Sequence, residues 1–343
     1  MPRTYDHLLY IQSLEGVLYS YDQLAGSDMF LTGPMRSEKT LGMIELLRIL
    51  KNNSELGGYE VMAFKPDMDT RGFDFLPADV NANTAYVSNI GEFEEGVVPI
   101  DTRDSSGILD YYLEAATRNP NQIIFIDEIQ FFDEGILDVV QKLKERGAFV
   151  IASGLDYNYR GEYFSKIIED YIAQSDDVVN LTSFCDYGNP KCGFKSRVTQ
   201  RYTNGTPSHF AENPVVLEVG VEHYFPVDRQ HLEVPGKKLA DKMRKIIVDD
   251  QGISVYSLYT QFGIVDIDSR EVQGESSFEE ISVILYRLYQ EGAVHIEGLE
   301  TKGLIEDLGE LARSILQSKD GQIIEHGEII TSGRLYYQGI ESY

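Results

Sequence analysis

A buried strand that ends in two acidic residues places the strongest constraint on the fold of this chain. Residues Ile123–Ile126 are apolar and mostly β-branched, which is typical of a strand covered on both faces of a parallel sheet. Asp127 and Glu128 follow directly, at the strand's carboxyl end, where ligands of open α/β sheets bind. One carboxylate there can hold Mg²⁺, directly or through water, and its neighbour can then act as a base. The sequence therefore predicts an α/β protein with an acidic ligand site at the edge of its sheet.

A second stretch, nearer the N-terminus, nearly matches the phosphate-binding loop G-x-x-x-x-G-K-[ST]. The backbone N–H groups, the lysine and the hydroxyl of such a loop hold phosphates and Mg²⁺. Gly33, Lys39 and Thr40 fit the pattern, but Glu38 stands where the second glycine is expected. A carboxylate about 4 Å from a phosphate charge costs about 1 kcal/mol in water and about 4 kcal/mol at an effective dielectric constant of roughly 20. Nucleotide binding therefore requires Glu38 to point outward or to be neutralised, with Arg36 and Lys39 as the nearest cations.

Both stretches also have a purely structural interpretation. The glycine loop can be an ordinary strand-to-helix turn. Acidic residues after a strand often only cap the next helix, as Asp133 and Glu134 could. Together, however, the two stretches favour nucleotide- and magnesium-dependent phosphoryl transfer, in which positioning and charge neutralisation supply most of the catalysis.

Apolar positions outside these two stretches predict further elements of the same fold. We expect strands over residues 29–32, 60–64 and 149–152, and helices over residues 39–51 and 136–146. The last helix has apolar residues at helical spacing and ends at Gly147. This alternation of strands and helices implies a parallel sheet that is covered by helices.

Further motifs follow in a fixed order along roughly residues 28 to 232. They are Gly33–Thr40 (GPMRSEKT), Phe64–Arg71 (FKPDMDTR), Ile126–Phe132 (IDEIQFF), Gly154–Asp156 with Arg160–Phe164 (GLD and RGEYF), Val179–Cys185 with Cys192–Arg201 (VNLTSFC and CGFKSRVTQR), and Gly220 and Tyr224 with Asp228–His231 (DRQH). In this order they resemble the type II thymidine kinases, the family of the human cytosolic enzyme and its bacterial counterparts. The resemblance implies a P-loop NTPase-type parallel sheet flanked by helices, with a small zinc and lasso subdomain.

The resemblance also implies roles for single residues. Glu128 resembles the general base that takes the proton from a nucleoside 5′-hydroxyl, and Thr40 and Asp127 resemble the magnesium site. The residues implied for the nucleotide are Gly33, Met35, Ser37, Lys39, Thr40, Asp127 and Gln130. The residues implied for the nucleoside are Asp69, Arg71, Phe131, Phe164, Thr199 and Tyr224, and Met35 resembles a residue that encloses base and sugar. For Phe131 and Phe164, simple core packing is the alternative.

The zinc region departs from the family pattern. The family's first ligand pair is C-x₂-C, whereas Cys185 and Cys192 are separated by six residues, and Asp228 stands in place of a third cysteine. Zinc accepts carboxylate oxygen and imidazole, so Cys185, Cys192, Asp228 and His231 can form a tetrahedral site if residues 186–191 bulge outward. The alternative is that the chain's two cysteines have no such role.

Three domains are expected in this chain of 343 residues. A P-loop kinase core spans residues 1–180, a zinc-ribbon-like and lasso subdomain residues 181–234, and a mostly helical α+β domain residues 235–343. Residues 205–216, rich in Asn, Pro, Ser and Gly, suit a flexible loop.

The C-terminal domain lies outside the family resemblance. We expect helices over residues 237–248 and 281–289, the second preceded by a capping box of Ser277 and Glu280 and followed by Gly292. A further helix is expected around Leu304–Ile315 and a hairpin within residues 322–337. Helices followed by a hairpin suggest a winged-helix module, but no basic recognition helix is visible, so protein contact is favoured over DNA binding.

The composition favours a cytoplasmic protein. The chain has no apolar run of eighteen residues and no basic and apolar signal sequence at its N-terminus. A formal net charge of −26 argues against nucleic-acid binding.

The sequence thus predicts ATP- and Mg²⁺-dependent phosphorylation of thymidine or a related deoxynucleoside, with Zn²⁺ as a possible structural ion. The resemblance implies a homotetramer, although the extra domain could block that assembly. The alternative is a catalytically silent nucleotide- or nucleoside-binding relative that acts through its C-terminal domain, which Glu38 and the altered zinc site favour.

Overall fold

The computed structural model describes residues 21–69, 76–77, 80–88, 90–214, 222–249, 253–266, 271–272, 277–297 and 334–337. The chain forms two compact units. The first unit comprises residues 1–201 and 224–232, and the second comprises residues 202–223 and 233–343.

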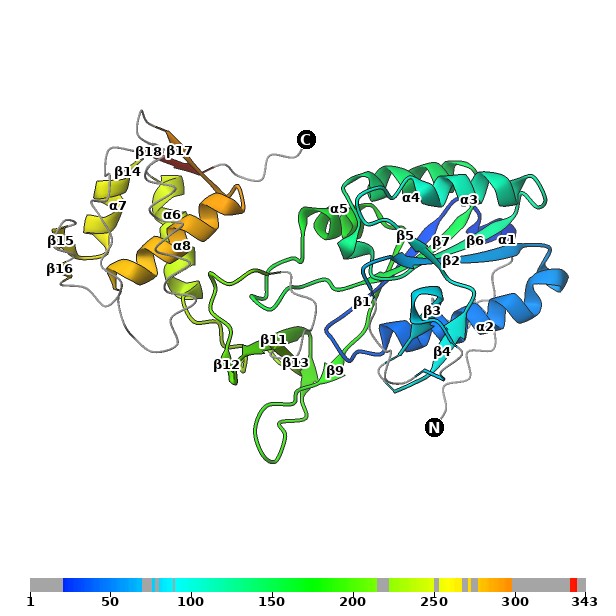
Figure 1. Ribbon diagram of the computed structural model, residues 1–343, viewed down its shortest axis with the longest axis horizontal. Coiled ribbons are helices and arrows are strands. Elements are labelled where there is room, and N and C mark those ends of the chain that lie inside the picture. Colours follow the sequence, from blue (N-terminus) through cyan, green and yellow to red (C-terminus); the bar gives the residue numbers. More distant parts are fainter. Residues whose placement is uncertain are drawn as a thin grey trace. The chain divides into compact units, whose positions relative to one another are not determined.

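A parallel sheet of six strands forms the centre of the first unit (Figure 1). In sheet order the strands are β5 (Val98–Ile100), β2 (Glu60–Pro66), β6 (Gln122–Ile126), β7 (Phe149–Gly154), β1 (Asp28–Thr32) and β8 (Asp177–Asn180). Every neighbouring pair in this sheet is parallel. β1 and β6, which carry the two predicted motifs at their carboxyl ends, are separated by β7. The predicted α/β fold is confirmed.

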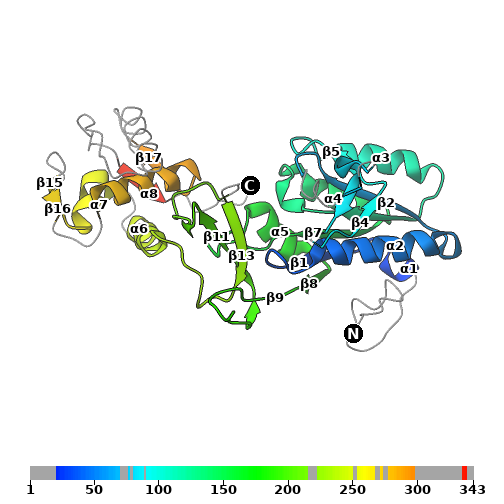
Figure 2. The ribbon, with the colours of Figure 1, turned by 60° about the horizontal axis from the view of Figure 1, so that its bottom comes forward.

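Helices cover both faces of this sheet, as Figures 1 and 2 show. One face packs against α1 (Tyr21–Leu24) and α2 (Lys39–Gly57), and the other against α3 (Gly107–Ala116), α4 (Gly135–Glu145) and α5 (Lys166–Gln174). Neighbouring strand residues point to opposite faces, so Ile123 and Phe125 join the core beside α2, whereas Ile124 and Ile126 join the other core. Because burying one such side chain contributes about 1.5–3 kcal/mol, these central strands stabilise the unit on both sides.

The observed elements begin and end close to the predicted bounds, except at α2. The sequence predicted the end of this helix at Lys51, but it continues to Gly57. Residues 52–57 contain no proline, and the helix ends where Gly58 adopts a left-handed φ of 66° and donates its N–H to the Ser54 carbonyl. Glycine is the usual residue for this type of helix end because it lacks a Cβ.

Acidic side chains do not cap α4. Glu134 is its N-cap residue but makes no side-chain capping hydrogen bond. The carboxylate of Asp133 instead accepts a hydrogen bond of 2.5 Å from Ser105. The structural alternative, in which these residues only cap a helix, is therefore wrong for α4.

A small hairpin that the sequence did not predict packs beside α2. It consists of β3 (Ala85–Val87), which follows the 3₁₀ helix η3 (Ala82–Thr84), and β4 (Phe93–Glu95). Arg48 of α2 contacts Glu92 at 3.0 Å and Glu94 at 3.2 Å, and Lys51 contacts Glu94 at 2.9 Å. Exposed ion pairs of this kind contribute about 0–1 kcal/mol each, so they orient the hairpin more than they stabilise it.

An ion-pair network around a buried carboxylate lies at the amino-terminal edge of the central sheet. Lys144 of α4 places its ammonium 2.5 Å from Asp28 of β1 and 2.8 Å from Asp176, which directly precedes β8. Asp28 and Asp176 also accept each other's backbone N–H groups at 3.2 and 3.0 Å. Asp28 is only 1% exposed. The network thus joins α4 to β1 and to the residue before β8. It lies at the edge of the sheet opposite to the predicted site.

Short antiparallel strands follow the central sheet along the chain. β9 (Ser183–Phe184) pairs with β10 (Lys195–Ser196). β11 (Val198–Thr203) lies between β12 (Thr206–Pro207) and β13 (Glu222–Val227). Asn204 and Gly205 join β11 to β12 with positive φ values of 53° and 82°, as a two-residue hairpin turn requires.

The described part of the second unit from residue 233 onward combines three helices with short strands. The elements are α6 (Lys237–Asp249), β14 (Ile253–Ser254), α7 (Val255–Gln261), β15 (Ile264–Asp266), β16 (Glu271–Val272), α8 (Phe278–Gln290), β17 (Val294–Glu297) and β18 (Arg334–Tyr337). β18 lies between β14 and β17 in an antiparallel sheet. The core of this unit includes the fully buried Met243, Leu258, Phe278 and Ile284.

Predictions for the second unit are partly confirmed. Ser277 caps α8 by accepting the Glu280 N–H at 3.1 Å, and Gly292 follows the helix with a φ of 69°. The hairpin predicted within residues 322–337 is wrong for β18, because the partners of this strand are β14 and β17. The helix predicted around Leu304–Ile315 lies outside the described residues. In the described part of the chain, no helix is long and apolar enough to cross a membrane.

Candidate active site

The loop between β1 and α2 has a backbone that only glycine can supply at its first position. Gly33 has a φ of 155°. A Cβ on Gly33 would lie 2.6 Å from the Leu181 carbonyl oxygen and 2.9 Å from the Ser37 hydroxyl. Both distances are shorter than van der Waals contact, so any side chain here would push the loop away from residue 181.

Glu38 adopts a glycine-like backbone at the position where the motif expects glycine. Its φ of 66° and ψ of 27° are left-handed, and it forms the N-cap of α2. This conformation costs a non-glycine residue about 1–2 kcal/mol. The side chain of Glu38 is exposed. The pKa of Glu45, farther along α2, is raised first by the partial burial of Glu45 and second by the negative charge of Glu38. Glu38 therefore points outward along the helix, as nucleotide binding would require.

Arg36 contacts other groups of the first unit. Its guanidinium pairs with Asp186 at 3.1 Å and lies over the ring of Phe225 at 5.1 Å from the centroid. The expectation that Arg36 could neutralise Glu38 therefore finds no support in its observed contacts.

Lys39 turns its ammonium into the loop. The Nζ atom donates to the carbonyl oxygens of Gly33 and Pro34, both at 2.9 Å, and to the Ser37 hydroxyl at 3.4 Å. The side chain is buried. A cation inside a loop of this shape can contact a bound phosphate group with little rearrangement.

The two predicted motifs meet across β7. The Thr40 hydroxyl, on the first turn of α2, donates to Asp127 Oδ2 at 3.4 Å. The other oxygen of Asp127 accepts hydrogen bonds from the Ser153 hydroxyl and from the Glu128 N–H, the latter at 3.0 Å. Ser153 lies on β7, between the two motif strands, so it orients the Asp127 carboxylate toward Thr40.

Glu128 is held in a strained and buried position beside this pair. It is only 5% exposed and has a left-handed φ of 51°. Its carboxylate accepts a hydrogen bond from the Gln130 amide, whose oxygen accepts the Leu155 N–H at 3.2 Å. Non-glycine residues with such backbones cluster at functional sites. Gln130, predicted from the resemblance to contact the nucleotide, is thus placed where it orients Glu128.

The residues predicted for a nucleoside lie on several elements of the first unit. Phe131 follows Gln130 in the 3₁₀ helix η4 (Ile129–Phe131), and its ring meets that of Phe164 edge-on at a centroid distance of 5.8 Å. Asp69 is buried with Lys65, whose ammonium lies 3.7 Å away. Tyr224 is half-buried on β13. Arg71 and Gly220 lie outside the described residues.

Thr199 connects β11 to the phosphate-binding loop. Its hydroxyl oxygen accepts the backbone N–H of Met35 at 3.0 Å, and the side chain is buried. The resemblance implied separate ligand contacts for these two residues, whereas here they contact each other.

Two further charged residues near the site had no assigned role at the sequence level. Asp156, at the end of the G-L-D segment, is buried and accepts a hydrogen bond of 2.8 Å from Arg197. Burial raises the pKa of Asp156, while the charges of Arg197 and Lys39 oppose that rise. The motif contained Asp156, but only the folded chain shows its partner.

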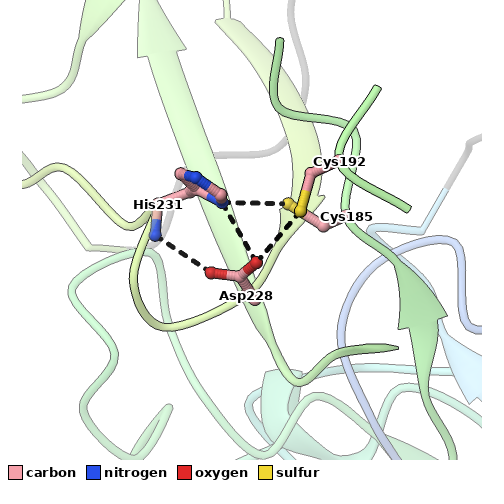
Figure 3. A group of neighbouring side chains, drawn as sticks. All are labelled: Cys185, Cys192, Asp228 and His231. Carbon is pink, nitrogen blue, oxygen red and sulfur yellow. Dashed lines mark hydrogen bonds and ion pairs between the residues drawn. The ribbon is translucent and has the colours of Figure 1, made fainter. Parts of the chain in front are cut away.

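Four potential metal ligands converge beside β9 and β13 (Figure 3). Each residue contributes one ligand atom, and these atoms all lie within 4.8 Å of one another; the residues are Cys185, Cys192, Asp228 and His231. Cys185 Sγ is 3.6 Å from His231 Nδ1, Cys192 Sγ is 3.4 Å from Asp228 Oδ2, and that oxygen is 3.0 Å from His231 Nδ1. Zinc bonds of about 2.0–2.3 Å place tetrahedral ligand atoms about 3.3–3.8 Å apart. The four residues are therefore close enough together to hold a metal ion, and the exposed residues 187–191 separate the two cysteines.

Comparison with known proteins gives a consistent result. The family model for thymidine kinase matches residues 26–232. The thymidine kinase of Coprothermobacter proteolyticus is 33% identical over 209 residues, which are 61% of this chain and 91% of that protein. The thymidine kinase of Ureaplasma urealyticum serovar 10 is 30% identical over 220 residues, or 64% of this chain and 88% of that protein.

The thymidine kinase of Ureaplasma parvum serovar 3 is 31% identical over 208 residues, or 60% of this chain and 82% of that protein. The matched region contains both halves of the candidate active site and the four potential metal ligands. The chain therefore belongs to the thymidine kinase family.

Proposed function

We propose that this chain transfers the γ-phosphoryl group of ATP to the 5′-hydroxyl of thymidine or a related deoxynucleoside. The observation that carries the proposal is the contact between Thr40 and Asp127 directly beside the buried Glu128. A hydroxyl and a carboxylate in this arrangement are typical Mg²⁺ ligands of P-loop enzymes. A second carboxylate next to them can accept the proton of the attacking hydroxyl.

The chain's own groups divide the work as follows in this proposal. Thr40 and Asp127 would hold Mg²⁺, which supplies charge neutralisation at the phosphate oxygens. The loop residues proposed to contact the nucleotide are Gly33, Met35, Ser37 and Lys39. Outward-pointing Glu38 leaves the inner side of the loop to Lys39.

Glu128 is proposed to act as the general base. The hydrogen bond from Gln130 fixes one carboxylate oxygen, and the strained backbone holds the residue in place. In this proposal the Glu128 carboxylate accepts the proton of the 5′-hydroxyl. The residues proposed to surround the nucleoside are Asp69, Arg71, Phe131, Phe164, Thr199 and Tyr224.

Transfer of labelled γ-phosphate from ATP·Mg²⁺ to thymidine tests this proposal directly. We expect labelled thymidine monophosphate from the wild-type chain. The rival function is silent nucleotide or nucleoside binding, which the carboxylate of Glu38 in the phosphate-binding loop favours. Nucleotide binding without product, with thymidine and with other deoxynucleosides, would support that rival.

Replacing Glu38 by glycine is expected to lower the KM for ATP about two- to fivefold. The replacement removes a negative charge from the phosphate-binding loop, and about 1 kcal/mol per charge pair, the value at about 4 Å in water, is the upper limit for an outward-pointing side chain. The replacement also removes the backbone strain of a left-handed non-glycine residue, which favours the folded state. Glycine loses more conformational entropy on folding, and this offsets about 0.5–1 kcal/mol of the gain in stability. Steady-state kinetics at low salt measures the change.

Glu38→Ala serves as the control, because it removes the charge but keeps a Cβ in the left-handed conformation. Equal KM values for the alanine and glycine variants would assign the effect to charge alone. The advantage of both variants should shrink at high salt because salt screens exposed charges. An unchanged KM for ATP in both variants would contradict the proposed repulsion.

We further propose that Cys185, Cys192, Asp228 and His231 bind one structural Zn²⁺. Asp228→Asn is expected to weaken zinc binding at least about tenfold, because even indirect partners of zinc ligands contribute about 10–100-fold to affinity. Metal analysis of the purified chain and competition with a chelator measure this.

Asp186→Asn is the matched control for zinc binding. Asp186 follows Cys185 directly, but its carboxylate pairs with Arg36 and Lys191 at 3.1 and 2.9 Å. This variant should therefore keep its zinc. Equal zinc retention by both asparagine variants would refute the ligand assignment of Asp228.

The proposal also covers the organisation of the whole chain. We assign residues 1–180 to the kinase core, residues 181–234 to the zinc and lasso subdomain, and residues 235–343 to an additional domain. The order of helices and strands around β14, β17 and β18 supports a winged-helix arrangement for this domain. A cytoplasmic homotetramer remains our expectation from the family.

A further inference from the structure

One strand of the first unit continues directly into the second. β11 spans Val198–Thr203, and the boundary between the units falls between Arg201 and Tyr202. At one end of the strand, Thr199 accepts the N–H of Met35 in the phosphate-binding loop. β11 therefore contacts the phosphate-binding loop near one end and belongs to the second unit at the other.

The far end of this strand is fastened by a carboxylate. Glu212 Oε2 accepts a hydrogen bond of 2.7 Å from the Thr203 hydroxyl, and its Oε1 accepts the His209 N–H at 2.8 Å. The Thr203 hydroxyl also lies 2.6 Å from that of Ser208. These bonds close residues 203–212 into a compact bracket, which we call the Glu212 bracket.

The Glu212 bracket is anchored in the core of the second unit. Phe210 is fully buried among residues of α6 and α8, and its N–H donates to the Pro235 carbonyl at 2.8 Å. The Arg244 guanidinium lies 5.2 Å from the centroid of its ring. Arg287 of α8 donates to the Ala211 carbonyl at 2.8 Å. The expectation of a flexible loop over residues 205–216 is thus wrong for its described part.

The second unit is more than an appendage at the end of the chain. The chain passes between the units after residues 201, 223 and 232. The first two passages bound residues 202–223, which belong to the second unit although they lie inside the family-matched residues 26–232. Within the second unit, this segment is held by the bracket and by the contacts of Phe210.

We propose that the second unit positions β11 for ligand binding through Glu212 and Phe210, so that occupancy of the phosphate-binding loop and anchoring of the bracket are coupled. Glu212 and Phe210 are positioning residues, and they act on the phosphate-binding loop through Thr199. The inference rests on the proposed function for the identity of its ligands. Coupling of this kind is reciprocal: a change that loosens the bracket weakens ligand binding, and bound ligand tightens the bracket by the same factor.

Thr203→Val tests the coupling with little change in side-chain shape. Thr203→Ser keeps the hydroxyl and should behave as wild type. Thr260→Val is the matched control, since it removes a hydroxyl of α7 that only contacts the Ser257 carbonyl at 2.9 Å. In the full-length chain, Thr203→Val should raise the KM for thymidine about fivefold, the lower end of typical coupling between sites. The kcat should change less, because Glu128 and Asp127 remain in place.

Hydrogen exchange supplies a test that requires neither catalysis nor ligand. Without ligand, Thr203→Val should exchange faster than wild type at residues 198–203 and at residues 33–38, while Thr203→Ser and Thr260→Val should not. With ADP·Mg²⁺ and thymidine added to wild type, exchange should slow at residues 208–212 as well as in the phosphate-binding loop.

The outcomes separate this inference from the proposed function. Absence of phosphoryl transfer by wild type would refute the function, but the ligand-free exchange would still decide the coupling. The coupling would be overturned if hydrogen exchange at residues 33–38 were unchanged in Thr203→Val. It would also be overturned if bound ligand slowed exchange only in the first unit. If Thr203→Val does not fold, Phe210→Leu and its core control Phe278→Leu provide the same comparison. A larger effect at residues 33–38 from Phe210→Leu supports the coupling, and equal effects overturn it.

Discussion

Replacement of Glu128 by glutamine is expected to reduce phosphoryl transfer to thymidine about 10²–10⁴-fold, the usual contribution of a general base. Glutamine has nearly the same shape but cannot accept a proton at neutral pH. Glu128 is buried directly after Asp127, and its carboxylate is held by the hydrogen bond from Gln130. The turnover number at saturating ATP and thymidine is the quantity to measure.

Nucleotide binding should survive this substitution, because Lys39 and Thr40 are unchanged. ADP affinity within about twofold of wild type would show that the loss lies in the chemical step. Glu134→Gln is the matched control: this carboxylate is exposed at the start of α4 and makes no side-chain capping bond. If Glu128→Gln retained more than about a tenth of the wild-type rate, the assignment of the base would be wrong.

Replacement of Lys144 by methionine is expected to destabilise the first unit by about 3–5 kcal/mol. Removing one partner of a buried ion pair leaves the other charge uncompensated, and Asp28 is almost completely buried. With a shift of about 2–4 °C per kcal/mol for a domain of this size, the melting temperature should fall by roughly 10 °C. Chemical and thermal unfolding, followed by circular dichroism, measure the loss.

Lys142→Met on the same helix is the control for this effect. Lys142 is exposed, and such surface substitutions usually change stability by less than about 0.5 kcal/mol. Similar melting temperatures for the two methionine variants would contradict the importance of the buried network.

The same network predicts how stability depends on pH. Burial disfavours the charged form of Asp176, but hydrogen bonds from Lys144 and Asp28 outweigh this and lower its pKa. A carboxyl whose pKa is lowered by folding stabilises the native state above its unfolded pKa of about 3.9, and this contribution disappears as the pH falls through the lowered value. Wild type should therefore lose stability below about pH 4 more steeply than Lys144→Met.

Local patterns were sufficient to predict the centre of the fold. The apolar run Ile123–Ile126 and the glycine loop before Lys39 each determine their own strand or loop, because burial on both faces and the positive φ at Gly33 restrict the residues allowed there. The meeting of Thr40 and Asp127 could also be expected, since carboxyl ends of parallel strands share one edge of the sheet.

Features that depend on distant contacts were not predictable from one sequence. The β3–β4 hairpin consists of very short strands that pack beside α2 through Arg48 and Glu94. The partner of Asp156 is Arg197, which lies on a different part of the chain. Phe210 is a single aromatic residue within a polar segment, so composition pointed to a loop although the side chain is buried.

The position of β7 between the two motif strands has a consequence for recognising related chains. Ser153 must present a hydroxyl to Asp127, and a Cβ at Gly154 would lie 2.5 Å from the Gln130 amide oxygen. A chain that keeps the contacts of Asp127 and Gln130 therefore needs a small hydroxyl residue followed by glycine at the end of the intervening strand. The Ser-Gly pair is thus a third signature, and a distant sequence that keeps the loop and the acidic pair but has bulky residues here should not assemble the same catalytic centre.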